Sequence, residues 1–336
     1  MAQQEPGGPV TIAYIAESAG VSVPTVSKVL NGRSGVAADT RARVEALVSQ
    51  YGYRRPPSPS SNLMELVFDD LKHMWGVEII RGVERVARAH RLGVVLTEFG
   101  PHRNAIRYWL DGALTRRPAC VVTAAHMSAE ERGRLRAKGI PFVVFDPPTE
   151  LPDDVPFVGA TNWSGGRSAT RHLVELGHRR IAMIAGPEGL LCGRARWDGY
   201  RSALEDAGVP VDPALVVRAE LTREAGAAAA ADLLARPDRP TAIFTCNDLQ
   251  ALGVYQAARA AGLSIPGDLS VVGFDDLPVA ELVEPGLTTV RQPLTEMAVA
   301  ATELALALGR GERTPQVGLE LATTLTVRAS TAPPPR

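Results

Sequence analysis

The chain has 336 residues, of which 45% are hydrophobic, and its formal net charge is −1 at pH 7. This length is too great for one small domain, and the composition is ordinary for a protein with large buried cores. No apolar run reaches membrane-spanning length, the N-terminus lacks a secretory signal pattern, and three widely spaced cysteines form no disulfide framework. The chain is therefore expected to be a cytoplasmic protein with no membrane contact.

Three short amphipathic helices are predicted in residues 11–55. Thr11 can cap the first helix, and Gly20 can end it, because a left-handed residue suits a tight corner between two helices. Ser22 can cap the second helix. The third helix is expected over residues 38–50.

The second of these helices has two chemically different faces. Its apolar residues fall on one side at helical spacing and should be buried: Val26, Val29 and Leu30. The opposite side is polar apart from one proline in the first turn, and it consists of Pro24, Ser27, Lys28 and Asn31. This arrangement is typical of a helix-turn-helix domain that enters the DNA major groove. A small helical bundle with solvated faces has the same spacing.

A proline- and serine-rich segment follows, and residues 56–63 are predicted to form an extended linker. Three of the four residues 56–59 are proline, which cannot propagate a helix. The segment is therefore not expected to form a helix.

From residue 64 onward, apolar strand-like runs alternate with helical segments. Strands are predicted at residues 64–68, 93–97, 119–123 and 141–145, and in a second set at 180–185, 215–218, 241–245 and 269–274. Residues 287–291, a helix over 294–308, and residues 317–327 should complete the body with returning strands. The predicted fold is an all-α headpiece followed by an α/β body of two doubly wound parallel-sheet lobes.

Polar residues at the carboxyl ends of the predicted strands are candidates for a ligand site, because the crevice of such sheets lies there. These candidates are Asp70, Asp146, Asn247 and Asp275, with Arg196 in the first turn of a helix and Trp75 near the first strand. Carboxylates, an amide and a guanidinium can fix pairs of hydroxyl groups, while an indole covers the C–H face of a sugar ring. Aspartates after strands also cap helices, and that role is favoured for Asp248 and Asp276.

Residue patterns of catalysis and of metal binding are missing from the sequence. It contains no phosphate-binding loop, no GxSxG elbow and no HExxH motif. The six histidines lack ligand spacing, so they are expected at the surface or at helix caps. We therefore expect no enzyme activity, no metal and no cofactor, although two cleft carboxylates could in principle act as a glycosidase pair.

The sequence resembles the LacI family of bacterial transcription regulators. The segments that carry this resemblance are TIAYIAESAGVSVPTVSKVLNG, VAADTRARVEAL and YGYR near the N-terminus, and HLVELGHRRIAMIAG, CNDLQALG, LSVVGFDD and GLTTVRQP in the body. The body of that family is similar to periplasmic sugar-binding proteins, and Arg196, Asn247 and Asp275 match positions that contact its effector. The proline-rich linker departs from the family, whose members carry a short hinge helix with a leucine that wedges into the minor groove.

The resemblance implies a DNA-binding domain at residues 1–55, a linker at 56–63, and an effector-binding and dimerisation body at 64–331. DNA contacts are expected from eight residues: Thr11, Ser22, Val23, Pro24, Thr25, Ser27, Lys28 and Asn31. The expected function is that of a homodimeric repressor, released from a pseudo-palindromic operator by a sugar or oligosaccharide. The alternatives are a regulator that responds to a nucleoside or purine or needs a corepressor, and a free-standing sugar-binding protein.

Overall fold

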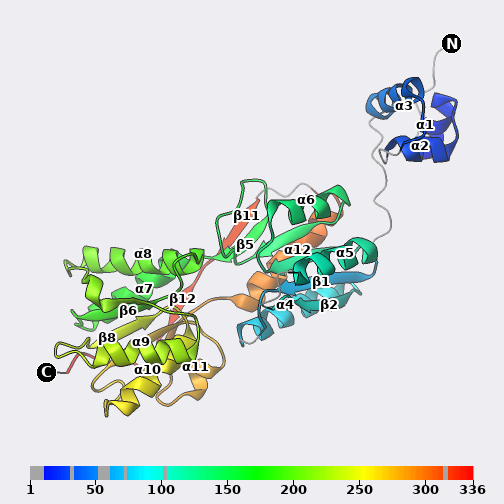
Figure 1. Ribbon diagram of the computed structural model, residues 1–336. Coiled ribbons are helices and arrows are strands. Elements are labelled where there is room, and N and C mark those ends of the chain that lie inside the picture. Colours follow the sequence, from blue (N-terminus) through cyan, green and yellow to red (C-terminus); the bar gives the residue numbers. More distant parts are fainter. Residues whose placement is uncertain are drawn as a thin grey trace. The chain divides into compact units, whose positions relative to one another are not determined.

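The computed structural model describes residues 11–30, 34–51, 61–71, 74–100, 104–312 and 317–335. The chain separates into two compact units with the boundary between Ser60 and Ser61. The first unit is the headpiece (α1–α3), and the second is the body (β1 to β12 with helices α4 to α12) (Figure 1).

The headpiece contains α1 (Ile12–Ala19), α2 (Val23–Leu30) and α3 (Ala38–Gln50), so the three predicted helices are confirmed. The Thr11 hydroxyl accepts a hydrogen bond from the Tyr14 amide at 3.2 Å and caps α1. Gly20 ends α1 with φ at 63°, a left-handed conformation that a side chain would disfavour. The core joins all three helices through buried residues, namely Ile15, Ala16, Ala19, Val26, Val29 and Val44.

The body contains two six-stranded sheets, one in each lobe. Lobe 1 has the strand order β11-β5-β4-β3-β1-β2, and every neighbouring pair is parallel. Its strands are β1 (Leu63–Phe68), β2 (Gly93–Glu98), β3 (Val121–Ala124), β4 (Phe142–Phe145), β5 (Phe157–Ala160) and β11 (Gly318–Leu321). Since β1 begins at Leu63, the last residue of the predicted linker belongs to the sheet.

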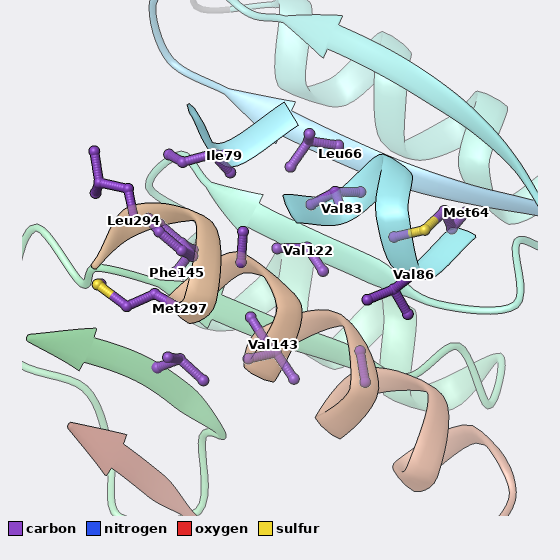
Figure 2. Packing of buried hydrophobic residues seen from close by; sticks show 14 of the residues in the cluster. Met64, Leu66, Ile79, Val83, Val86, Val122, Val143, Phe145, Leu294 and Met297 are labelled. Atoms are coloured by element: carbon purple, nitrogen blue, oxygen red, sulfur yellow. The ribbon is translucent and has the colours of Figure 1, made fainter. Parts of the chain in front are cut away.

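Helices cover both faces of the lobe 1 sheet, as doubly wound sheets require. They are α4 (Trp75–Ala89) and α12 (Leu294–Gly309) on one face, and α5 (Ala105–Arg116) and α6 (Ala129–Ala137) on the other. Figure 2 shows how Val83 and Val86 of α4 and Met297 of α12 pack on strand residues such as Leu66 and Val143.

Lobe 2 has the strand order β12-β10-β9-β8-β6-β7, and β12 alone of these pairs antiparallel to its neighbour. Its strands are β6 (Ile181–Ala185), β7 (Val216–Arg218), β8 (Ala242–Thr245), β9 (Ser270–Asp275), β10 (Thr288–Arg291) and β12 (Thr324–Thr326). Its helices are α7 (Asn162–Glu175) and α8 (Leu191–Asp206) on one face, α9 (Arg223–Leu234) and α10 (Asp248–Ala260) on the other, and the short α11 (Val279–Leu282).

The described chain passes between the lobes at three places: after β5, after β10 and after β11. Helix α12 therefore packs on α4 in lobe 1 although it follows a strand of lobe 2 (Figure 1). Two of the crossings are joined, because the Thr323 amide donates to the Thr161 hydroxyl at 2.9 Å and the two hydroxyls lie 3.1 Å apart.

Two details of the body differ from the sequence prediction. Strand β5 was not expected, because its four residues contain Gly159 and are too short to show a periodic pattern. The predicted returning segment at residues 317–327 is divided between the lobes, with β11 in lobe 1 and β12 in lobe 2. The parallel α/β architecture of both lobes is as predicted.

Candidate functional site

The polar face of α2 is exposed, whereas its opposite face is part of the headpiece core. Val26 and Val29 are buried, and Val23 is 40% exposed at the start of the helix. The other described DNA-contact candidates lie on the surface or partly on it, and they are Thr11, Ser22, Pro24, Thr25, Ser27 and Lys28. The helix therefore presents small polar groups and one ammonium to its surroundings.

The start of α2 is held by hydroxyl groups. Ser22 directly precedes the helix, its carbonyl accepts from the Val26 amide at 3.2 Å, and its hydroxyl lies 2.9 Å from that of Thr25. The predicted contact of Asn31 and the predicted linker up to residue 60 lie outside the described residues.

The candidate ligand site of the body is centred on Arg196, which is only 3% exposed. Its Nε donates to Asn162 Oδ1 at 2.9 Å, Nη1 donates to the Cys246 carbonyl at 2.6 Å, and Nη2 donates to Gln292 Oε1 at 2.8 Å. Gln292 Nε2 in turn donates to Asp146 Oδ2 at 3.4 Å. These bonds link the residue after β4 in lobe 1 with α8 and the residue after β10 in lobe 2.

Asp275 and Phe274 complete the surroundings of the guanidinium. Asp275 Oδ1 lies 3.7 Å from Arg196 Nη2, and the guanidinium carbon lies 3.6 Å from the centroid of the Phe274 ring. A buried cation over an aromatic face and beside a carboxylate is stabilised by both. Arg196 is thus fixed before any ligand arrives.

Close packing between α7 and α8 sets the position of Arg196. A Cβ on Gly166 of α7 would overlap the Arg196 carbonyl, and a Cβ on Gly199 of α8 would overlap the Trp163 carbonyl. Glycine at these two positions lets the helix backbones touch. The guanidinium therefore extends from a helix whose backbone lies directly against that of α7.

The two carboxylates beside Arg196 lie in a strongly desolvated place. Burial raises the pKa of Asp275 to about 7, with the positive charge of Arg196 opposing the shift and the charge of Asp146 adding to it. Burial likewise raises the pKa of Asp146, against the charge of Arg196 and hydrogen bonds from Gln292 and Asn162. Both residues have positive φ values, 44° for Asp146 and 108° for Asp275, and backbone conformations that are costly for a residue with a side chain cluster at functional sites.

Asn247 lies next to this network and also caps a helix. It is 6% exposed, its Oδ1 caps α10 by accepting from the Gln250 amide at 2.9 Å, and its Nδ2 donates to the Leu221 carbonyl at 3.1 Å. The Cys246 carbonyl that precedes it accepts from Arg196. Asn247 is therefore held at the end of β8, beside the guanidinium.

The helix-capping role expected for Asp248 and Asp276 is wrong. The cap of α10 is Asn247, and Asp248 instead accepts from the Leu277 amide at 2.8 Å and from the Thr289 hydroxyl. Asp276 accepts from the Thr326 hydroxyl at 3.2 Å and lies 2.7 Å from Arg328. Both carboxylates connect loops and strands of lobe 2. The prediction failed because the position of a residue in the sequence does not reveal such distant partners.

Asp70 and Trp75 lie in lobe 1. Asp70 is exposed beyond the end of β1. Trp75 packs edge-on against Phe68 and Phe145, with ring centroids 6.2 Å and 5.7 Å away. Because Phe145 directly precedes Asp146, Trp75 supports the strand end that carries this carboxylate. Among the predicted ligand residues, the structure brings Asp146, Arg196 and Asp275 together in one network, with Asn247 adjacent.

The expected surface position of the histidines is wrong for His178. This ring is buried, and its nitrogens lie 2.9 Å from the Thr241 hydroxyl and 2.9 Å from the Ala332 carbonyl. It joins the C-terminal segment to lobe 2. In the described ranges, no three His, Cys, Asp or Glu side chains gather in a way that could hold a metal ion.

Two family models match the chain. Residues 11–56 match the bacterial regulatory proteins of the lacI family, and residues 170–331 match a periplasmic binding protein-like domain. The regulator CelR of Thermobifida fusca is 33% identical over 334 residues, which cover 95% of this chain and 98% of CelR. The regulator DegA of Bacillus subtilis is 32% identical over 342 residues, which cover 96% of this chain and 98% of DegA.

The chain belongs to the LacI family. It is therefore a helix-turn-helix regulator of transcription, with the matched DNA-binding region on the headpiece. Solved LacI-family structures agree over the whole length. The CelR–cellobiose complex superposes with a TM-score of 0.75 at 34% identity and covers 96% of this chain and 99% of that one.

A second solved relative is the lac repressor dimer bound to operator and the anti-inducer ONPF. It superposes with a TM-score of 0.71 at 26% identity, over 97% of this chain and all of that one. The headpiece followed by two α/β lobes is thus the fold of the LacI family. Among the described helices, none has both the length and the apolar character of a membrane span.

The predicted ligand residues did not include Asn162 and Gln292, whose side chains accept hydrogen bonds from the Arg196 guanidinium. Gln292 directly follows β10, so the strand-end rule that selected Asp146 and Asp275 could have found it. Asn162 begins α7 just after β5, and that strand was not predicted. Because β5 was not predicted, the strand-end rule could not select Asn162.

Proposed function

We propose that the chain is a repressor that a sugar or oligosaccharide releases from its operator. The observation that carries this proposal is the buried group of Arg196, Asp146 and Asp275, which draws residues of both lobes into one polar network. A guanidinium and two carboxylates can hold pairs of sugar hydroxyls. The similarity to CelR, whose structure contains cellobiose, supports this ligand class.

The headpiece is proposed to place α2 in the major groove of the operator. Lys28 can donate to guanine O6 or N7, and Val23 can contact a thymine methyl group. Thr25 and Asn31 are proposed to contact phosphates, and Thr11, Ser22, Pro24 and Ser27 complete the surface that faces DNA.

Contacts between the lobes offer a way to couple ligand binding in the body to DNA binding by the headpiece. Besides the bond between Gln292 and Asp146, the Leu191 amide of α8 in lobe 2 donates to the carbonyl of Pro148, in the lobe 1 loop after β4, at 2.9 Å. A sugar inserted among such contacts changes the free energy of one lobe arrangement relative to another. Operator affinity then changes by linkage if only one arrangement suits DNA.

The proposed organisation is a DNA-binding domain at residues 1–55, a linker at 56–63 and an effector-binding body at 64–331. We propose a homodimer in the cytoplasm, which would place two headpieces on the half-sites of a pseudo-palindromic operator. The lac repressor relative, solved as a dimer on its operator, supports this arrangement. The mass of the purified chain on gel filtration with light scattering tests it.

Three other functions have weaker support. A nucleoside or purine effector, or a corepressor, would use the same cleft. A free-standing sugar-binding protein would not need the exposed polar face of α2. Catalysis by a carboxylate pair is not part of the proposal, because Asp146 and Asp275 share the buried Arg196 and the relatives are regulators.

Thermal unfolding of the full chain with candidate ligands tests the effector class. A ligand that binds only the folded chain raises Tm by mass action. Monosaccharides and oligosaccharides are expected to raise Tm in a concentration-dependent way, while adenine, guanine and their nucleosides leave it unchanged. A shift with nucleobases alone would replace the sugar proposal by the purine alternative.

A further inference from the structure

A cavity of about 750 Å³ opens beside the Arg196 network. It is lined from lobe 1 by the loop after β4, by β5 and by β11, and from lobe 2 by the first turns of α7 and α8. Its volume lies within the range of about 300–1,000 Å³ that is typical of small-molecule sites. The cavity is therefore large enough for a whole cyclic unit of a ligand.

The cavity continues from the network instead of standing apart from it. Asp146 lines its wall and accepts from Gln292, and Asn162 lines it and accepts from Arg196. The other predicted effector residues, Arg196, Asn247 and Asp275, do not line it. A ligand that touches Asp146 can thus extend into a space that the predicted site did not include.

The chemistry of the lining selects one class of ligand. Every charged side chain of the lining is acidic, and these are Asp146, Glu150 and Glu320. An anionic group would be repelled there, whereas hydroxyl groups can donate to the carboxylates. The remaining lining includes Leu151, Phe157 and Leu191, which suit C–H surface.

Trp163 gives this cavity a platform for a ring. Trp163 lines the cavity at the start of α7 and is 45% exposed, unlike the half-buried Trp75. The Arg167 guanidinium lies 5.9 Å from the indole centroid and helps to hold the ring. An exposed indole next to carboxylates matches the alternating apolar faces and polar edges of a pyranose.

We propose that this cavity is a subsite for the second glycosyl unit of an oligosaccharide effector. The inference rests on the proposed function, because it assumes that a first unit binds beside Asp146. The second unit stacks on Trp163 and donates hydroxyl hydrogen bonds to Glu320 or Glu150. Since both lobes line the cavity, an oligosaccharide there contacts both and favours a different lobe arrangement from a monosaccharide.

Titration calorimetry on the full chain tests the subsite with two homologous series: glucose, cellobiose and cellotriose, and glucose, maltose and maltotriose. In the wild type, the disaccharide of one series is expected to bind at least about tenfold more tightly than glucose. In Trp163→Ala the ratio of disaccharide to glucose affinity falls by about tenfold, and Trp163→Phe restores part of it. Tyr108→Ala, which removes a 74% exposed aromatic residue from α5 outside the cavity, leaves the ratio unchanged.

The outcomes separate the two proposals. Equal affinity for mono- and disaccharides, or a Trp163→Ala variant that keeps the wild-type ratio, overturns the subsite while the sugar-responsive repressor stands. Binding of none of these saccharides also overturns the subsite. If, in addition, only a nucleobase or nucleoside stabilises the chain, the sugar effector is wrong as well.

Discussion

The headpiece and the body place their candidate recognition residues in opposite environments. On α2 the predicted DNA contacts are exposed or half-buried, and the helix is held by Val26 and Val29 on its other face. In the body Arg196 and Asp275 are buried and bound to other residues of the chain. DNA is a large partner that meets a surface, whereas a small ligand needs groups fixed out of water. Substitution of a recognition residue should therefore leave the stability of the headpiece unchanged, whereas in the body it should also lower the free energy of unfolding.

The strongest way to break this comparison is Arg196→Ala. The substitution leaves Asp146, Asp275, Asn162 and Gln292 without a cation at the centre of the body, and removing one partner of a buried ion pair costs about 3–5 kcal/mol. Urea denaturation followed by circular dichroism should show this loss in the free energy of unfolding of the body.

The matched control for this experiment is Arg167→Ala. Arg167 pairs with Asp206 at 2.9 Å, but the pair is open to solvent, with side chains 36% and 58% exposed, so its loss costs about 0–1 kcal/mol. Equal destabilisation by the two substitutions would contradict the view that the body site is part of the core.

Lys28→Ala probes the other side of the comparison. Because Lys28 is exposed on α2, its loss should leave the unfolding transition unchanged and cost about 1–3 kcal/mol of operator binding at one base pair. Fluorescence anisotropy with operator variants at that base pair and with random DNA measures the effect. A uniform loss on all duplexes would assign Lys28 to a phosphate instead of a base.

The pH dependence of stability gives a smaller effect than Arg196→Ala. The pKa of Asp275 is raised from 3.8 to about 7, so its contribution to stability is complete below pH 3.8 and is lost as pH rises through about 7. Between pH 5 and pH 7.5 the wild type should lose about 2–3 kcal/mol more than Asp275→Asn. Raised pKa values of Asp146 and Asp248 act in the same direction, and the lowered pKa of His178 acts in the other, so the difference between the two proteins is what matters.

The same pH series shows whether burial raises the pKa of Asp275 in the folded body. Denaturation curves for both proteins at half-unit intervals of pH would give the two profiles. Parallel profiles would mean that Asp275 stays ionised in the folded body, and its burial beside Arg196 would then not raise its pKa.

Much of the fold followed from periodicity, and the exceptions have physical causes. The third helix was predicted at its observed bounds, residues 38–50, because the helical spacing of Val44, Leu47 and Val48 is a local pattern. Strand β5 and the division of residues 317–327 between the lobes depend on distant partners. The local sequence pattern does not show which distant strands will pair.

The candidate site was predictable only in part for the same reason. Position at a strand end identified Asp146, Asn247 and Asp275, and the structure places them around or beside Arg196. The roles of Gln292 and of Asp248 depend on which side chains from other strands meet them. Which lobe contributes each partner is a property of the crossovers, and it becomes visible only in three dimensions.

The most direct test of the account measures operator affinity of the full chain with and without the sugar that raises its Tm. We predict that saturating sugar weakens binding to an inverted-repeat operator by about 5–150-fold, with little change on random DNA, and that operator weakens sugar binding by the same factor. The same operator affinity with and without bound sugar would contradict the claim that sugar binding in the body releases the headpiece from DNA.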